Sequence, residues 1–465
     1  MELVTTEFEA IVHVMDKGTV SIGECCCETV LDRGDLTMPK PQCTKFLATL
    51  TSCLSPEVLD QMGTETGFVT RFRAITPALL VPALIADLGA GRVETLADLC
   101  RNFAQFAGVE VDYKSFHDRL AREAFPRLMR EVFTAVSDSL ILRVLRFLPG
   151  NPFARFKHIL IQDGTSFALH DALAEMYPGR FNKVSPAAVE LHTTVDLCTE
   201  ALTEIALTPD TTSERDALPL PAALAGSLLL ADRGYPSFEY LRDLDVAGAY
   251  YLMRGKLSVG YEVMGRFESG VRTDLAQPVR LKELLAMTSD ARLDLWVRQT
   301  KDGDVHDCRM IAIRTREGWT ILLTNLPASD FSAEQVGLAY RLRWQIELMF
   351  KEWKSYANLH RFATENAWIA EGLIWASLCA AILKRFLAHA AQHVGKVAIS
   401  TRKAAMMIGG HLHAILNGLR CDAEQARQAF KDLMDFLISQ GGRAHPARDV
   451  RSGRLKIGLR SAFQC

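Results

Sequence analysis

The spacing of apolar and polar positions changes several times along the chain. From Phe46 to Leu148 apolar residues recur at helical intervals, and after Pro149 short apolar or alternating runs appear between turn residues. Such runs are typical of β-strands. The expected strands are residues 158–162, 188–197, 202–207, 227–231 and 249–253, with a helix over 236–246.

The second half of the chain first continues in the β manner and then becomes helical. Residues 255–327 alternate between apolar and polar side chains, with glycine-containing turns, and from Ser332 to about residue 440 the spacing is helical. We therefore expect an α/β fold with a mixed sheet, a β-rich insertion, and helical regions at both ends of the chain.

The N-terminal helical region contains a candidate DNA-reading motif. Residues 94–106 and 114–125 are expected to form two helices joined by a short turn. Helix-turn-helix DNA readers and ordinary packed helix pairs share this pattern, so both interpretations stay open.

A long helix expected over residues 333–358 has two different faces. Its apolar face consists of Leu342, Ile346, Met349 and Trp353. Within about 80° on the other side lie a phenol, a carboxylate and three cations; these are Tyr340, Arg343, Glu347, Lys351 and Lys354. Ion pairs at i,i+4, such as Arg343–Glu347 and Glu347–Lys351, would explain the charges as those of a plain amphipathic helix.

Two aspartates add a chemical interpretation to that helix. Asp163 and Asp232 each follow an apolar strand and are followed by glycine within two residues. A carboxylate at the end of a buried strand is costly to desolvate unless it caps a loop, is paired, or binds a metal. With Glu347 these aspartates would suit two Mg²⁺ ions about 4 Å apart, an arrangement that serves in-line displacement at phosphorus.

The charge of the chain is balanced in sum but not in distribution. It has 53 basic and 55 acidic residues, which excludes a uniformly basic nucleic-acid binder. Residues 1–60 carry ten acids against four bases, and residues 441–465 carry six bases against one acid. Residues 139–162 and 372–420 contain no acid at all, which indicates either a solvated basic face or a surface that meets a polyanion.

The cysteines and the apolar runs point to the cytoplasm. Eleven cysteines include no C-x-x-C pair, and Cys25, Cys26 and Cys27 are adjacent, so we expect free thiols and no structural zinc. The longest apolar run, residues 372–383, is about half of the ~20 residues that a membrane span needs. We therefore predict a cytoplasmic protein without a membrane partner.

The polar face of the helix at 333–358, which we call the charged stripe (Tyr340, Arg343, Glu347, Lys351 and Lys354), also matches a known signature. Tyr340, Arg343, Glu347 and Lys354 resemble, position for position, the Y-x₂-R-x₃-E-x₆-K signature of bacterial DDE transposases of the insertion-sequence-four family. The segments at 163–165 and 232–235 resemble the two aspartate segments of that family. The resemblance implies an RNase-H-like fold with a β-rich insertion before the catalytic glutamate.

The resemblance also implies roles for residues. Asp163, Asp232 and Glu347 would be the catalytic, metal-binding triad; Tyr340, Arg343, Lys351 and Lys354 would bind DNA. Trp319 is the nearest candidate for a tryptophan that holds a flipped base, with strand core as its other interpretation. His192 and Asp196 lie where the family shows a strand with histidine and aspartate, and His192 is equally well explained as a strand histidine satisfied by a neighbour.

The expected domains follow from the pattern and the resemblance together. We predict a poorly ordered acidic leader at 1–45, a helical DNA-binding domain at 46–150, an RNase-H-like catalytic domain at 151–254 and 328–390, the insertion at 255–327, and a helical region with a basic tail at 391–465.

The implied activity is excision and integration of an insertion sequence. It would proceed by metal-dependent strand cleavage and transesterification at terminal inverted repeats, with two Mg²⁺ ions (Mn²⁺ as a substitute), double-stranded DNA as partner, and a homodimer as the acting form. The alternatives are a metal-dependent nuclease of the same fold and a catalytically silent, transposase-derived DNA-binding protein.

Overall fold

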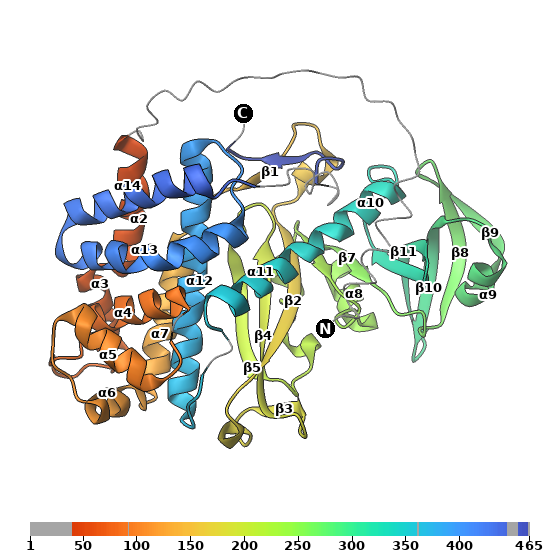
Figure 1. Ribbon diagram of the computed structural model, residues 1–465. Coiled ribbons are helices and arrows are strands. Elements are labelled where there is room, and N and C mark those ends of the chain that lie inside the picture. The colour runs from red at the N-terminus through yellow and green to blue at the C-terminus, as the bar shows by residue number, and fades with distance from the viewer. Residues whose placement is uncertain (1–39, 92, 360–361, 444–453, 464–465) are drawn as a thin grey trace.

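The computed structural model describes residues 40–91, 93–359, 362–443 and 454–463 (Figure 1). Within these residues eleven strands form one mixed sheet. At its centre β2 (Ile159–Ala168) runs parallel to β6 (Leu228–Ala231), which runs parallel to β7 (Tyr250–Arg254). On the other side of β2, β4 (Ser185–Asp196) is antiparallel and carries β3 (Pro178–Phe181) and β5 (Leu202–Pro209). Strands β2, β4, β5, β6 and β7 confirm the runs predicted from the sequence.

The β-rich insertion continues the same sheet. Its strands are β8 (Tyr261–Glu268), β9 (Val271–Arg280), β10 (Arg292–Lys301), β11 (Asp304–Thr315) and β12 (Gly318–Thr324), with helix α9 (Leu281–Met287) between β9 and β10. Strand β12 pairs antiparallel with β7, so Leu322 lies opposite Arg254. A second apolar core, which includes Leu295 and Met310, joins the insertion to helix α8 (Phe238–Val246). The insertion is therefore held rigidly against the central strands.

The helices from the two ends of the chain pack together beside the sheet (Figure 1). The N-terminal helices are α2 (Lys40–Leu54), α3 (Pro56–Glu65), α4 (Pro77–Ala90), α5 (Leu96–Ala107), α6 (Tyr113–Leu120) and α7 (Ala124–Ser139). The C-terminal helices are α12 (Ala367–Gly395), α13 (Thr401–Cys421) and α14 (Ala423–Gln440). Helix α12 contacts α4, α7, α13 and α14, so the two helical regions share one core.

Helix α12 is long and apolar enough to cross a membrane by length and composition, but it is a core helix in this fold. It has 29 residues, and 78% of its most apolar 18-residue window is buried inside the protein. Gly372 lies so close to Phe125 of α7 that a Cβ atom there would be 2.2 Å from the ring. The apolar surface of α12 is therefore used for packing against the other helices.

The ends of the chain differ in part from the predicted pattern. Helix α2 begins at Lys40, inside the segment expected to be poorly ordered, whereas residues 1–39 lie outside the described residues. The basic tail contributes an unpredicted strand, β13 (Leu459–Ser461), which pairs with β1 (Leu145–Phe147). Strands of three residues are too short to show an alternating pattern in the sequence.

The predicted helix pair of the N-terminal region forms. It corresponds to α5 and α6, and α5 ends at Gly108, whose φ of +67° is a left-handed C-cap. The second helix ends at Leu120, before the predicted 125, because α7 starts anew at Ala124. A DNA-reading role for this pair stays a prediction.

Candidate active site

The two aspartates lie on neighbouring parallel strands at the same level. Gln162 of β2 pairs with Ala231 of β6, so Asp163 and Asp232 are each the next residue along adjacent strands. Asp163 does not end its strand as predicted. Strand β2 continues to Ala168 because β4 still pairs with it after β6 has ended.

The third carboxylate comes from a helix that lies across the sheet (Figure 1). The predicted helix 333–358 is interrupted: α10 (Ala333–Tyr340) is followed by a 3₁₀ turn (Arg341–Arg343) and then by α11 (Trp344–Tyr356). A 3₁₀ turn winds more tightly than an α-helix, and α10 and α11 follow one another on either side of it (Figure 1). This interruption corrects the prediction of one continuous helix.

The apolar face of this segment is buried as the sequence predicts. The side chains of Leu342, Ile346, Met349 and Trp353 are all 2% exposed or less. Helix α11 contacts β2, α12 and α13, and this packing turns the opposite face, with Glu347, toward the aspartates.

Arg343 and Tyr340 connect the three carboxylates. Arg343 Nη1 lies 2.8 Å from Asp163 Oδ2, and its Nη2 lies 2.6 Å from Glu347 Oε1. The Tyr340 hydroxyl donates to Asp232 Oδ1 at 3.0 Å. Three distant segments of the chain therefore meet in one polar cluster, which we call the carboxylate site (Asp163, Asp232 and Glu347 with Tyr340 and Arg343).

The carboxylates of this site differ in their affinity for protons. Burial raises the pKa of Asp163 to about 7, against the attraction of Arg343. Burial also raises the pKa of Glu347, again against Arg343. Burial acts upward on Asp232 too, but Arg343, the Arg233 amide and Arg254 outweigh it and lower the pKa of Asp232. Neighbouring carboxylates with such divided pKa values are a mark of functional sites.

The donors of the carboxylate site suit a divalent metal ion. Three carboxylates offer the oxygen ligands that hard cations prefer, and one guanidinium neutralises only part of their charge. In the described part of the chain no three acidic, histidine or cysteine side chains are already grouped as metal ligands. Arg343 lies between Asp163 and Glu347 and pairs with both.

The two lysines of the stripe lie differently from each other. Lys354 Nζ donates to the carbonyl of Ser166 at 2.7 Å, which attaches α11 to β2 three residues after Asp163. Lys351 is exposed, and its Nζ lies 5.1 Å from the centre of the Trp344 ring. The expected Arg343–Glu347 pair forms, whereas Lys351 stacks on Trp344.

Trp319 lies at the edge of the sheet toward which β6 and β7 run. It precedes Leu322, the partner of Arg254, by three residues along β12. Its ring is half-buried against the second core, and the Arg314 guanidinium lies 4.8 Å from the ring centre. The buried part of the ring agrees with a role in the strand core, and the exposed part leaves the predicted DNA contact open.

His192 and Asp196 have structural partners. His192 is buried, with Nε2 at 3.0 Å from the Thr208 hydroxyl. Asp196 accepts hydrogen bonds from the backbone amides of Cys198 and Thr199 and lies 2.8 Å from His158. Thr208 thus pairs with Nε2 of the strand histidine, whereas its Nδ1 is buried without a hydrogen-bond partner among the described residues. The two backbone contacts make Asp196 a turn cap.

Arg254 is a residue that the sequence reasoning missed. It is the last residue of β7, whereas Asp232 is the first residue after the neighbouring β6, and the charge of Arg254 helps lower the pKa of Asp232. The sequence predicts a strand at 249–253, and Arg254 is the charged residue directly after it. Asp163 and Asp232 were singled out because they too follow apolar strands, so the same criterion would have identified Arg254.

The structure shows a protein with a carboxylate site on a mixed sheet. Comparisons with known proteins show which family has such a site. Residues 154–383 match the family described as "Transposase DDE domain", a range that contains all three carboxylates. Residues 154–383 are therefore a DDE transposase domain, and the resemblance seen in the sequence is confirmed.

Whole-length relatives agree with this family. The chain is 23% identical over 444 residues to the transposase for insertion sequence element IS231E of Bacillus thuringiensis subsp. finitimus, covering 86% of this chain and 92% of the relative. It is 24% identical over 435 residues to the IS231D transposase of the same organism, covering 84% and 90%. A shorter segment of 77 residues, 16% of this chain and 21% of the relative, is 46% identical to the putative transposase InsL for IS186A of Escherichia coli (strain K12).

The raised pKa of Asp163 predicts how stability changes with pH in the absence of metal. The pKa is about 7 in the folded protein against an ordinary 3.8. The resulting contribution to stability is therefore fully present below pH ~4 and is lost as the pH rises through ~7. In a chelating buffer, the melting temperature of Asp163→Asn relative to the parent should therefore be higher at pH 8 than at pH 5.

Asp232→Asn is the matched control for this thermal measurement. The pKa of Asp232 is lowered, so its charged form favours folding throughout this pH range and the variant should melt below the parent. A difference between Asp163→Asn and the parent that is independent of pH would contradict the predicted titration.

Proposed function

We propose that this protein excises and integrates an insertion sequence by cutting DNA at terminal inverted repeats and joining the cut ends to target DNA. The observation that carries the proposal is the meeting of Asp163, Asp232 and Glu347 from β2, β6 and α11, within a transposase DDE domain. The three carboxylates, linked through Arg343 and Tyr340, support this proposal.

The proposed catalytic residues are the three carboxylates. Asp163, Asp232 and Glu347 would hold two Mg²⁺ ions, with Mn²⁺ as a substitute. Such ions supply stabilisation of the charge that develops at phosphorus and lower the pKa of an attacking water. The Tyr340 hydroxyl orients Asp232, to which it donates at 3.0 Å, and Arg343 keeps Asp163 and Glu347 together at one guanidinium.

The proposed partner is double-stranded DNA bound by a homodimer in the cytoplasm. Exposed Lys351 lies one helical turn after Glu347 on α11, where it would meet a phosphate next to the scissile one. Arg343 and Lys354 would add contacts to phosphates, and Arg343 has the planar fork that binds phosphate oxygens in pairs. These contacts give affinity, whereas recognition of the end sequence needs base or shape readout.

A cleavage experiment tests the proposal. The protein is incubated with a DNA fragment that carries the element's terminal repeats, in Mg²⁺, in Mn²⁺ and in chelator. We expect strand breaks at the repeat boundary in either metal and none in chelator. Breaks spread over the fragment would favour the nuclease alternative, and tight binding without any break would favour the silent DNA-binding protein.

The salt dependence of DNA binding tests the role of Lys351. A cation that neutralises one phosphate adds about 0.9 to the slope of log affinity against log salt concentration. Lys351→Ala should therefore lower that slope by about one, measured by fluorescence anisotropy with end DNA. Lys282→Ala on α9, which removes an exposed lysine of the insertion, is the control and should leave the slope unchanged. Equal slopes for both variants would remove Lys351 from the DNA interface.

A further inference from the structure

A buried ion-pair network lies behind the catalytic helix. Arg385 of α12 donates to Glu200 Oε2 through Nε at 2.6 Å and to Glu352 Oε2 through Nη1 at 2.7 Å. His389 Nε2 lies 2.7 Å from Glu200 Oε2, and the Thr401 hydroxyl donates to the other oxygen of Glu352 at 2.5 Å. The side chains of Arg385, Glu200 and Glu352 are each 13% exposed. The network therefore consists of charges shielded from water and paired with one another.

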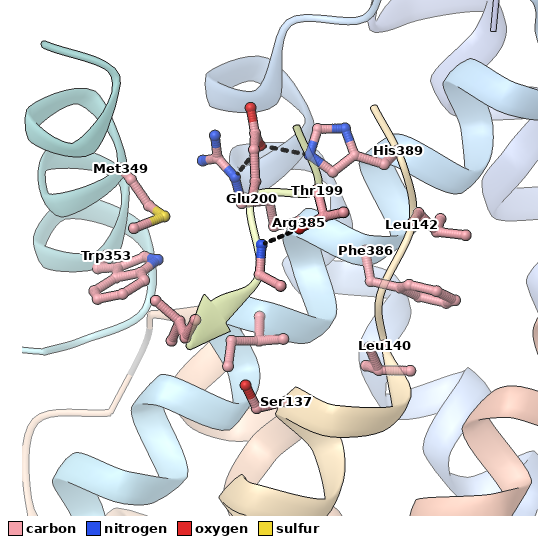
Figure 2. A pocket seen from close by; sticks show the side chains of 13 residues that line it. Ser137, Leu140, Leu142, Thr199, Glu200, Met349, Trp353, Arg385, Phe386 and His389 are labelled. Carbon is pink, nitrogen blue, oxygen red and sulfur yellow. Dashed lines mark hydrogen bonds and ion pairs between the residues drawn. The ribbon is translucent and has the colours of Figure 1, made fainter. Parts of the chain in front are cut away.

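The network joins four parts of the fold. Glu200 belongs to the turn between β4 and β5, Glu352 to α11, Arg385 and His389 to α12, and Thr401 is the first residue of α13. Figure 2 shows Glu200 held between Arg385 and His389, with Met349 and Trp353 of α11 across a small cavity. The cavity measures about 30 Å³, room for roughly one or two water molecules, so it leaves these elements closely packed.

The position of Glu347 depends on the C-terminal half of α11. A 3₁₀ turn at Arg341–Arg343 separates α10 from α11, and beyond this turn α11 makes its own contacts with the rest of the fold. Glu352 follows Glu347 by five residues, about 7.5 Å along a helix axis. Next to Arg385, buried Lys384 donates from Nζ to the carbonyl of Tyr356 at 2.6 Å, at the end of α11. Consecutive residues of α12 thus hold α11 at its side and at its end.

We propose that Arg385 is a positioning residue for the catalytic Glu347: by pairing with Glu352 and Glu200 it fixes α11 relative to the strands that carry Asp163 and Asp232. This inference rests on the proposed function. Burial opposes the charge on Glu200, but Arg385 and His389 outweigh it and keep the pKa of Glu200 well below its ordinary value, so the pair is ionised at neutral pH.

The test compares Arg385→Met with a matched control. Arg309→Met removes another buried arginine, which pairs through Nε and Nη2 with Asp294 in the insertion at 2.8 and 2.6 Å and is 2% exposed. Three quantities are measured on the full-length protein: hydrogen exchange of the amides in residues 344–356, the affinity for end DNA, and the rate of end cleavage at saturating DNA.

For Arg385→Met we expect faster exchange across 344–356 and a cleavage rate at least about tenfold lower, because a displacement of about 1 Å can cost up to about a hundredfold. The affinity for end DNA should change by less than about threefold, because the variant slows the cleavage step and leaves DNA binding intact. Arg309→Met should leave exchange in 344–356 and cleavage at parental values. Unchanged exchange in Arg385→Met, or equal effects in both variants, would overturn the proposal.

A neutral network separates positioning from stability. Removing one partner leaves buried charges unpaired, which destabilises a protein, so the triple variant E200Q, E352Q and R385M removes all three charges together. It should melt near the parent yet keep fast exchange in 344–356 and slow cleavage. Recovery of parental exchange and cleavage would show that Arg385 only neutralises the charges of Glu200 and Glu352, and would overturn the proposal. If the parent itself does not cleave, the proposed function fails, while the exchange measurement still decides whether Arg385 fixes α11.

Discussion

Replacing Glu347 with glutamine is expected to reduce DNA end cleavage by about a thousandfold or more. The change removes the charge of a proposed oxygen ligand but keeps the shape of the side chain and its place on α11. Loss of a metal-binding carboxylate removes several kcal/mol of transition-state stabilisation, and each ~1.4 kcal/mol is a factor of about ten in rate. The affinity for end DNA should stay within about threefold of the parent, because the variant loses an interaction that forms only in the transition state and not in the bound DNA complex.

Glu334→Gln is the control for this measurement. Glu334 is an exposed glutamate in the first turn of the neighbouring helix α10, and its replacement should leave cleavage unchanged. Cleavage by Glu347→Gln at the parental rate would place the catalytic carboxylate elsewhere.

Removing the Arg343 guanidinium should make the protein depend on metal for stability. Arg343 is 12% exposed and pairs with both Asp163 and Glu347, so Arg343→Ala leaves carboxylates close together without a cation. Breaking a buried ion pair from one side costs about 3–5 kcal/mol. We therefore expect a clear drop in melting temperature in chelator, and a larger rise on adding Mn²⁺ than the parent shows, because an ion that binds only the folded state stabilises it.

Arg343→Ala should also weaken binding to end DNA without removing metal binding. Arg309→Ala is again the control, since it breaks a buried pair with Asp294 outside the carboxylate site and should lose the same stability with and without Mn²⁺. An equal metal-induced rise in Arg343→Ala and the parent would mean that Asp163 and Glu347 do not share a metal ion with Asp232.

The strands and the carboxylate site could be predicted because local rules govern them. Apolar runs marked β2, β6 and β7, and the aspartates that follow the runs of β2 and β6 lie at the same level of the sheet. The spacing on α11 likewise predicted that Ile346 and Met349 face inward while Glu347 faces the site.

The remaining features depend on partners far apart in sequence. The contact of Arg385 with Glu200 spans 185 residues, and no local pattern pairs two such charges. The interruption at Arg341–Arg343 is equally hidden, since the residues around it have ordinary helical spacing. The pairing of β12 with β7, which joins the insertion to the central strands, requires the folded register of Leu322 opposite Arg254.

Strand transfer tests the central claim most directly. A DNA fragment with the terminal repeats is incubated with the protein, Mg²⁺ and a supercoiled target plasmid, and the products are sequenced across their junctions. A transposase joins the 3′ ends at the repeat boundary to target DNA, and we expect such junctions with the parent and none with Asp232→Asn. Ends that are cut at the boundary but never joined would contradict transposition and leave a nuclease.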